Sequence, residues 1–170
     1  NYNFEALEAS GDYDDYHTVY DGLYGWEPYP DDGTGAMLET LDTDSISSVN
    51  PHYLVFTASD EQTGFSNKAY DGIYLNKGEK YKVSLYTRRM GYDGGIYGVI
   101  DLWGEEVQRI ELLPPEKGES SDNKWQKTDI EFIAEQDVCA GTFAIVLEHM
   151  GRVCFDFISL AVNNVVKNFY

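Results

Sequence analysis

The stretch that decides the fold is Lys80-Tyr81-Lys82-Val83-Ser84-Leu85-Tyr86-Thr87-Arg88, in which apolar and polar residues alternate. Successive side chains on a β-strand point to opposite faces of the sheet. We therefore expect Tyr81, Val83 and Leu85 to face a core, and Tyr86 and Arg88 to point away from it. The stretch predicts a β-strand that is buried on one side.

The rest of the chain repeats this pattern in short pieces between turn sequences. Further strands are predicted near residues 53–57, 97–103, 107–113, 125–132, 142–148 and 153–162, and the last two are expected to form a hairpin around Met150-Gly151. Residues 9–48 are expected to be mostly loop. Eight to ten short strands without an amphipathic helix predict an all-β fold, a β-sandwich jelly roll of two antiparallel sheets. The length of 170 residues predicts one domain over residues 1–170.

The chain is strongly acidic, with 30 Asp and Glu residues against 12 Lys and Arg residues and a net charge of -18. A negative surface repels the phosphates of nucleic acids and of anionic lipids, so neither is an expected partner. No apolar run is long enough to span a bilayer. Neutral polymers and cations fit this charge better. The composition is typical of a secreted protein, which we expect to be a monomer.

Three predicted strands place aromatic and polar side chains together on an outward face. These candidate ligand-binding residues are Tyr86, Arg88, Tyr97, Asp101, Trp103 and Glu148, with Tyr92 added as a contact at the tip of a glycine-rich loop. Each has a plainer explanation, since Trp103 is equally compatible with a core and Arg88 with an ion pair to Asp101 or Glu148. The tyrosines of the segment 12–32 are expected to pack within loops, with one or two reaching a ligand.

Catalytic motifs are absent from the sequence. Asp101 and Glu148 are the best pair of carboxylates for glycoside hydrolysis, but among 30 acidic residues some pair always looks plausible. The three histidines lack the spacing of a metal site or a catalytic triad. We therefore expect no enzymatic activity.

Cys139 and Cys154 are expected to be reduced, buried thiols, because the predicted hairpin keeps them too far apart for a disulfide.

An ordered series of short motifs covers nearly the whole chain. It comprises Asn3-Phe4-Glu5 with Gly25-Trp26, the segment 75–86, the segment 124–132 and Phe155-Asp156-Phe157-Ile158-Ser159-Leu160. The series resembles carbohydrate-binding modules of families 4, 9 and 22. Asn50-Pro51-His52-Tyr53-Leu54 also resembles the accessory domain near the N-terminus of family 51 α-L-arabinofuranosidases.

The resemblance implies a concave sheet that receives one polysaccharide chain of the plant cell wall, such as β-glucan, xylan or xyloglucan. It implies a parent glycoside hydrolase in the same polypeptide, which the module holds near its substrate. It also implies a structural Ca²⁺ bound by Glu5 and Asp156, although Phe157 stands where these families often have a second acid. The candidate residues above would then contact the sugar.

Three alternatives stay open at this point. The chain could be a structural sandwich domain of an arabinofuranosidase that binds no ligand. It could be an adhesion domain whose tyrosine-rich loops bind a protein. A small glycosidase is the third alternative, and it would release reducing sugar.

Overall fold

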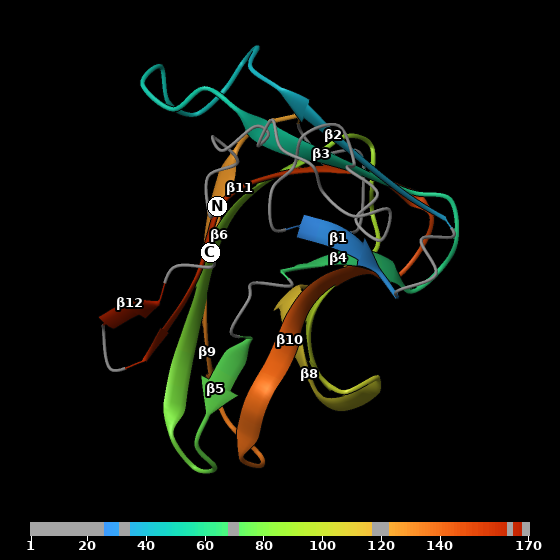
Figure 1. Cartoon of the computed structure of the whole chain (residues 1–170). Helices are drawn as coiled ribbons and strands as arrows, with labels where there is room; N and C mark the ends of the chain where they lie inside the picture. The colour runs from blue at the N-terminus through green and yellow to red at the C-terminus, as the bar shows by residue number, and fades with distance from the viewer. Residues whose placement is uncertain (1–25, 31–34, 68–71, 117–122, 163–164, 168–170) are drawn as a thin grey trace, which may run out of the picture.

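The computed structural model describes residues 26–30, 35–67, 72–116, 123–162 and 165–167, which form two antiparallel β-sheets packed face to face (Figure 1). The first sheet has the order β1-β4-β10-β7-β8, with β5 paired to β10. The second has the order β2-β3-β11-β6-β9, with β12 paired to β11. The strands are β1 (Trp26–Tyr29), β2 (Ala36–Leu41), β3 (Tyr53–Ala58), β4 (Thr63–Asn67), β5 (Ile73–Leu75), β6 (Lys80–Arg89), β7 (Ile96–Leu102), β8 (Glu105–Leu113), β9 (Gln126–Ile133), β10 (Val138–Leu147), β11 (Gly151–Val162) and β12 (Val165–Lys167).

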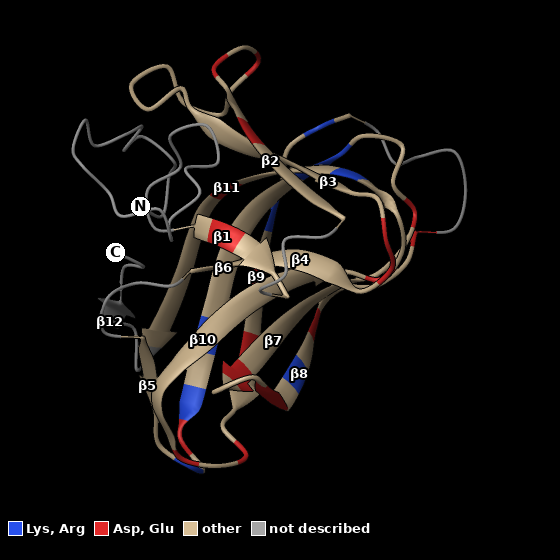
Figure 2. Cartoon of the chain, turned by 45° about the vertical axis from the view of Figure 1, so that its right-hand side comes forward, with Lys and Arg blue, Asp and Glu red and all other residues tan. Residues whose placement is uncertain are grey.

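The predicted all-β sandwich is confirmed. The described residues contain no helix, and hence none that could cross a bilayer. Figure 2 shows β10, β7 and β8 of the first sheet side by side. Of the predicted loop 9–48, residues 9–25 and 31–34 lie outside the described part of the chain, whereas the remainder contains β1 and β2.

Aromatic side chains join the two sheets in the core. Phe65 on β4 of the first sheet contacts Phe56 on β3 and Phe155 on β11 of the second, with ring centroids 5.3 Å and 5.0 Å away. Trp26 on β1 packs edge-on against Phe65 at 5.4 Å. Ring pairs at these separations add to the free energy gained from burying their area. Phe65 is therefore the central contact between the layers.

The prediction that one side of β6 faces the core is confirmed, since Tyr81, Val83 and Leu85 are buried there. The predicted hairpin of the last two long strands is wrong, however. β10 belongs to the first sheet and β11 to the second, so the turn after β10 carries the chain from one sheet to the other. Alternation shows which side of a strand is buried, but it does not show which strand lies beside it.

Gly64 on β4 allows an unusually close approach between strands. A Cβ atom at this position would lie 1.9 Å from the carbonyl oxygen of Ile145 on β10, the strand paired with β4. A backbone atom cannot yield as a flexible side chain does, so this position requires glycine.

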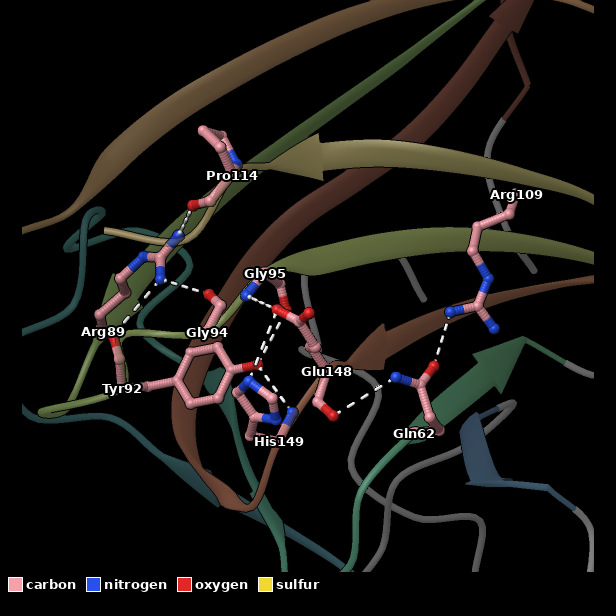
Figure 3. Close-up of polar contacts among 9 residues, drawn as sticks. All are labelled: Gln62, Arg89, Tyr92, Gly94, Gly95, Arg109, Pro114, Glu148 and His149. Carbon is pink, nitrogen blue, oxygen red and sulfur yellow. Dashed lines mark hydrogen bonds and ion pairs between the residues drawn. The ribbon is translucent and has the colours of Figure 1, made fainter. Parts of the chain in front are cut away.

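Arg89, at the end of β6, connects the two sheets through a buried guanidinium group (Figure 3). It donates hydrogen bonds to the carbonyl oxygens of Tyr92 at 3.3 Å, Gly94 at 2.7 Å and Pro114 at 2.8 Å. Gly94 precedes β7 and Pro114 follows β8, so both lie beside strands of the first sheet. One side chain of the second sheet thus fixes two loops of the first.

Candidate functional site

The outward face of the first sheet carries a group of polar and aromatic side chains. Because Phe65 and Ile145 point into the core, their neighbours on β4 and β10 point outward, and the strand register extends this face to β1, β7 and β8. We call it the first-sheet face and define it by Tyr29, Tyr97, Asp101, Glu106 and Arg109. Figure 2 shows acidic positions on both sides of the single basic position on β8.

A small apolar cluster lies beneath these side chains. Val99, Ala144 and Val146 are fully buried and form a cluster separate from the main core, with Tyr29 packed against it. Polar residues around an apolar floor are the usual composition of a site that binds a small molecule or a sugar.

Arg109 on β8 organises the polar part of the face. Its Nε and Nη2 atoms each donate to the Glu106 carboxylate at 2.7 Å, and Nη1 donates to Oε1 of Gln62 at 2.6 Å. The guanidinium carbon lies 5.5 Å from the centroid of the Tyr97 ring. The double hydrogen bond from Arg109 lowers the pKa of Glu106, which therefore stays ionised.

Tyr29 and Asp101 are joined across the same face. The Tyr29 hydroxyl donates to Oδ2 of Asp101 at 3.1 Å, and the Gly104 amide donates to Oδ1 at 2.8 Å. Burial and then the charge of Asp101 raise the pKa of Tyr29. The Asp101 carboxylate thus accepts one hydrogen bond on each oxygen, which fixes its orientation on the face.

The structure therefore brings two of the predicted site residues together, Tyr97 and Asp101. Trp103 lies nearby in the turn between β7 and β8 and is 84% exposed, so the alternative that it is a core residue is wrong. Glu148, just after β10, accepts a hydrogen bond from the Gly95 amide at 2.8 Å, before the start of β7 (Figure 3).

The position predicted for Tyr92 is wrong. Its side chain is only 3% exposed. Its hydroxyl donates to the Gly95 carbonyl at 2.8 Å and accepts from the His149 amide at 3.3 Å. The glycine-rich sequence suggested an exposed loop tip, but the ring packs inward and holds the loop to the segment after β10.

Tyr86 and Arg88 do not lie on the first-sheet face. They belong to β6 and point outward from the second sheet, on the opposite side of the sandwich. The prediction that they share one trough with Tyr97 and Asp101 is therefore wrong. Tyr86 is half-buried and contacts the Phe157 ring edge-on, with centroids 5.9 Å apart.

Arg88 lies against two aromatic rings, which also contact each other, instead of pairing with Asp101 or Glu148. Its guanidinium carbon lies 5.1 Å from the ring centroid of Tyr53 and 5.0 Å from that of Trp125. Arg88 also donates to the Tyr53 hydroxyl at 2.8 Å and to the Asp44 carbonyl at 3.2 Å, and the Trp125 ring nitrogen donates to the same carbonyl at 2.9 Å. This cluster fastens the β2–β3 loop over the second sheet.

Sequence reasoning missed Gln62, Glu106 and Arg109. Tyr29 was considered only among the tyrosines expected to pack in loops. The β8 segment gave a weak signal because its alternation is irregular, and the strand pairing between β7 and β8 shifts twice in register.

The carboxylate pair considered for glycoside hydrolysis does not exist. Glu148 binds the backbone before β7, whereas Asp101 lies six residues farther along, near the end of that strand. Six residues of strand span about 20 Å. Catalytic carboxylates of glycosidases lie about 5–10 Å apart, so Asp101 and Glu148 cannot act together.

The predicted Ca²⁺ site is only partly described. Asp156 is completely buried, and its Oδ1 accepts a hydrogen bond from the Phe157 amide at 2.8 Å. Glu5 lies outside the described residues, and those described contain no group of three or more His, Cys, Asp or Glu residues arranged to hold a metal. Since Ca²⁺ takes six to eight oxygen ligands, Asp156 fits as one ligand of an incomplete set.

Both cysteines are free thiols, as predicted, but Cys139 is exposed and only Cys154 is buried.

No protein family and no curated protein matches the sequence. Among solved structures, the arabinose-bound α-L-arabinofuranosidase MgGH51 is similar, with a TM-score of 0.68 and 18% identity over 82% of this chain. The CBM22-1 xylan-binding domain of Paenibacillus barcinonensis Xyn10C has a TM-score of 0.61 and 14% identity, with 96% of this chain and 93% of that domain covered. The fold is that of a family 22 carbohydrate-binding module. The predicted resemblance is thus confirmed at the level of the fold.

Two further facts limit what this fold likeness implies. The chain spans only 23% of the arabinofuranosidase. A cyclase from Fischerella sp. TAU is also similar, with a TM-score of 0.56, 12% identity, and coverage of 81% of this chain and 84% of the cyclase. The fold therefore supports more than one function, and the function has to be argued from the face itself.

Proposed function

We propose that this chain is a non-catalytic carbohydrate-binding module and that its ligand lies on the first-sheet face. The observation that carries the proposal is the Tyr97–Arg109–Gln62 contact, with Glu106 on its other side. A ring beside a fixed guanidinium, an amide and a carboxylate offers packing for the apolar side of a sugar and hydrogen bonds for its hydroxyls.

The ligand class is a neutral plant cell-wall polysaccharide, with xylan as the first choice and β-glucan or xyloglucan as the others. The net charge of -18 opposes the binding of polyanions. A similar solved domain, whose alignment covers 96% of this chain, is a xylan-binding domain. The parent protein would be a secreted glycoside hydrolase. Binding would raise the effective concentration of substrate around its catalytic domain.

The hydrogen bonds on the face argue against catalysis. Asp101 and Glu106 are cross-strand neighbours, but Tyr29 and Gly104 donate to the first and Arg109 to the second. The hydrogen bonds from Arg109 lower the pKa of Glu106, so this group is held as an anion and is not suited to act as the proton donor that glycoside hydrolysis requires.

Affinity electrophoresis against soluble xylan, β-glucan and xyloglucan tests the proposal. We expect the parent to be retarded by at least one polymer, and Tyr97→Ala to bind it about 2- to 10-fold more weakly, as expected for the loss of one aromatic contact. Tyr86→Ala is the matched control, because it removes a half-buried tyrosine from the opposite sheet.

Each other outcome has a definite meaning. A loss with Tyr86→Ala but not Tyr97→Ala would place the ligand on the second sheet and contradict the proposal. No retardation by any glycan would support a structural domain instead, and binding to a partner protein alone would support an adhesion domain. Released reducing sugar would show an enzyme.

We also propose that a structural Ca²⁺ binds next to Asp156, with Glu5 as a second ligand. A cation stabilises a buried carboxylate, and removing the cation takes that stabilisation away. Thermal melts in a strong chelator should therefore show a melting temperature several degrees lower than melts in calcium. Asp156→Asn should abolish this difference. Identical melts in chelator and calcium, with no calcium found in the protein by elemental analysis, would refute the site.

A further inference from the structure

The turn between β7 and β8 displays a tryptophan in an unusual way. Trp103 is 84% exposed, the largest exposed fraction, shared with Val49, among large hydrophobic residues in the described part of the chain. Its backbone φ is 55°, and that of Gly104, which follows, is 92°. Two successive residues with positive φ between antiparallel strands are typical of a tight hairpin turn.

Tryptophan is a poor choice for this turn. The left-handed conformation is unfavourable for a bulky side chain, and Asn-Gly is the preferred pair at such a position. The ring does not compensate by packing into the core, since most of it is exposed to water. Strain at an exposed aromatic residue suggests that the side chain serves something outside the fold.

Asp101 connects this turn to the first-sheet face. One oxygen of its carboxylate accepts from the Gly104 amide within the turn, and the other accepts from the Tyr29 hydroxyl. The turn that carries Trp103 is therefore held in a fixed position relative to the proposed sugar site. A fixed backbone at this turn reduces the conformational entropy lost when Trp103 binds a ligand.

We propose that Trp103 is an outlying stacking platform that makes the module selective for long polysaccharide chains over short oligosaccharides. This inference rests on the proposed function. Tyr97 lies five residues before Leu102, where β7 ends, which corresponds to about 17 Å of strand, and Trp103 follows in the turn. A disaccharide on the face beside Tyr97 cannot reach Trp103, whereas a long chain can contact both.

The test compares the parent with Trp103→Asn by calorimetric titration with a disaccharide, a hexasaccharide and the polymer of whichever glycan the parent binds. Asparagine tolerates positive φ, so the variant should melt at the same temperature as the parent or higher. We expect its affinity for polymer and hexasaccharide to fall about 2- to 10-fold, with the disaccharide unchanged. Loss of affinity without loss of stability cannot result from unfolding.

Tyr86→Ala is the control, because Tyr86 on β6 points outward from the opposite sheet and its loss should change none of these affinities. Unchanged polymer binding by Trp103→Asn would overturn the inference while leaving the proposed function intact. An equal loss for short and long ligands would overturn the length selectivity. A parent that binds no glycan would contradict the proposed function itself, and with it this inference.

Discussion

Replacing Arg89 with methionine is expected to lower the free energy of unfolding by about 3–5 kcal/mol. The guanidinium is 4% exposed and donates to the carbonyl oxygens of Tyr92, Gly94 and Pro114. Methionine fills similar space but has no N–H donor. Each buried carbonyl that loses its donor costs about 1–3 kcal/mol, and the link between the two sheets is lost at the same time.

Urea unfolding followed by circular dichroism measures this change. Arg152→Met is the matched control, because the Arg152 side chain pairs with the Glu39 carboxylate at 3.5 Å, and the two side chains are 43% and 41% exposed. An exposed ion pair contributes about 0–1 kcal/mol. If the two variants were equally stable, Arg89 would not be the connection between the sheets that its contacts indicate.

Replacing Arg109 with alanine is expected to weaken binding of the glycan that retards the protein in affinity electrophoresis by about 10- to 100-fold, with little change in stability. A hydrogen bond to a charged group contributes about 1.5–3 kcal/mol. Within the described residues Glu106 and Gln62 engage three N–H groups of Arg109. A guanidinium has five, so two remain for sugar hydroxyls. Isothermal titration of parent and variant measures the effect.

Arg109→Lys separates the charge from the shape of this side chain. Lysine keeps the positive charge beside Glu106, but it lacks the planar fork that bonds two partners at fixed angles. We expect the lysine variant to bind almost as weakly as the alanine variant. Restoration of full affinity by lysine would show that only the charge matters, and unchanged affinity of the alanine variant would exclude Arg109 from the binding site.

The sequence was sufficient for the strands and their buried sides because these depend on local alternation. Tyr81, Val83 and Leu85 are buried as predicted. The partner of each strand depends on the path of the chain between the sheets, which alternation does not encode. β6 and β7 follow one another in sequence but lie in different sheets, so Tyr86 and Arg88 were assigned to the same face as Tyr97 in error.

The missed residues share a different cause, which is the distance in sequence between partners. Arg109 bonds to Gln62 across 47 positions, and Tyr29 bonds to Asp101 across 72. No short motif links such residues, and each appears ordinary in its own segment. The prediction for Tyr92 was wrong for the same reason. Its hydroxyl accepts a hydrogen bond from the amide of His149, which lies 57 positions away.

The three tryptophans occupy three distinct surroundings. Trp26 is enclosed by the aromatic core, Trp125 lies against the Arg88 guanidinium, and Trp103 is open to water. The molecule therefore contains its own set of fluorescent reporters. A neutral water-borne quencher such as acrylamide reaches Trp103 first, so emission from that residue can be followed separately whenever something covers the β7–β8 turn.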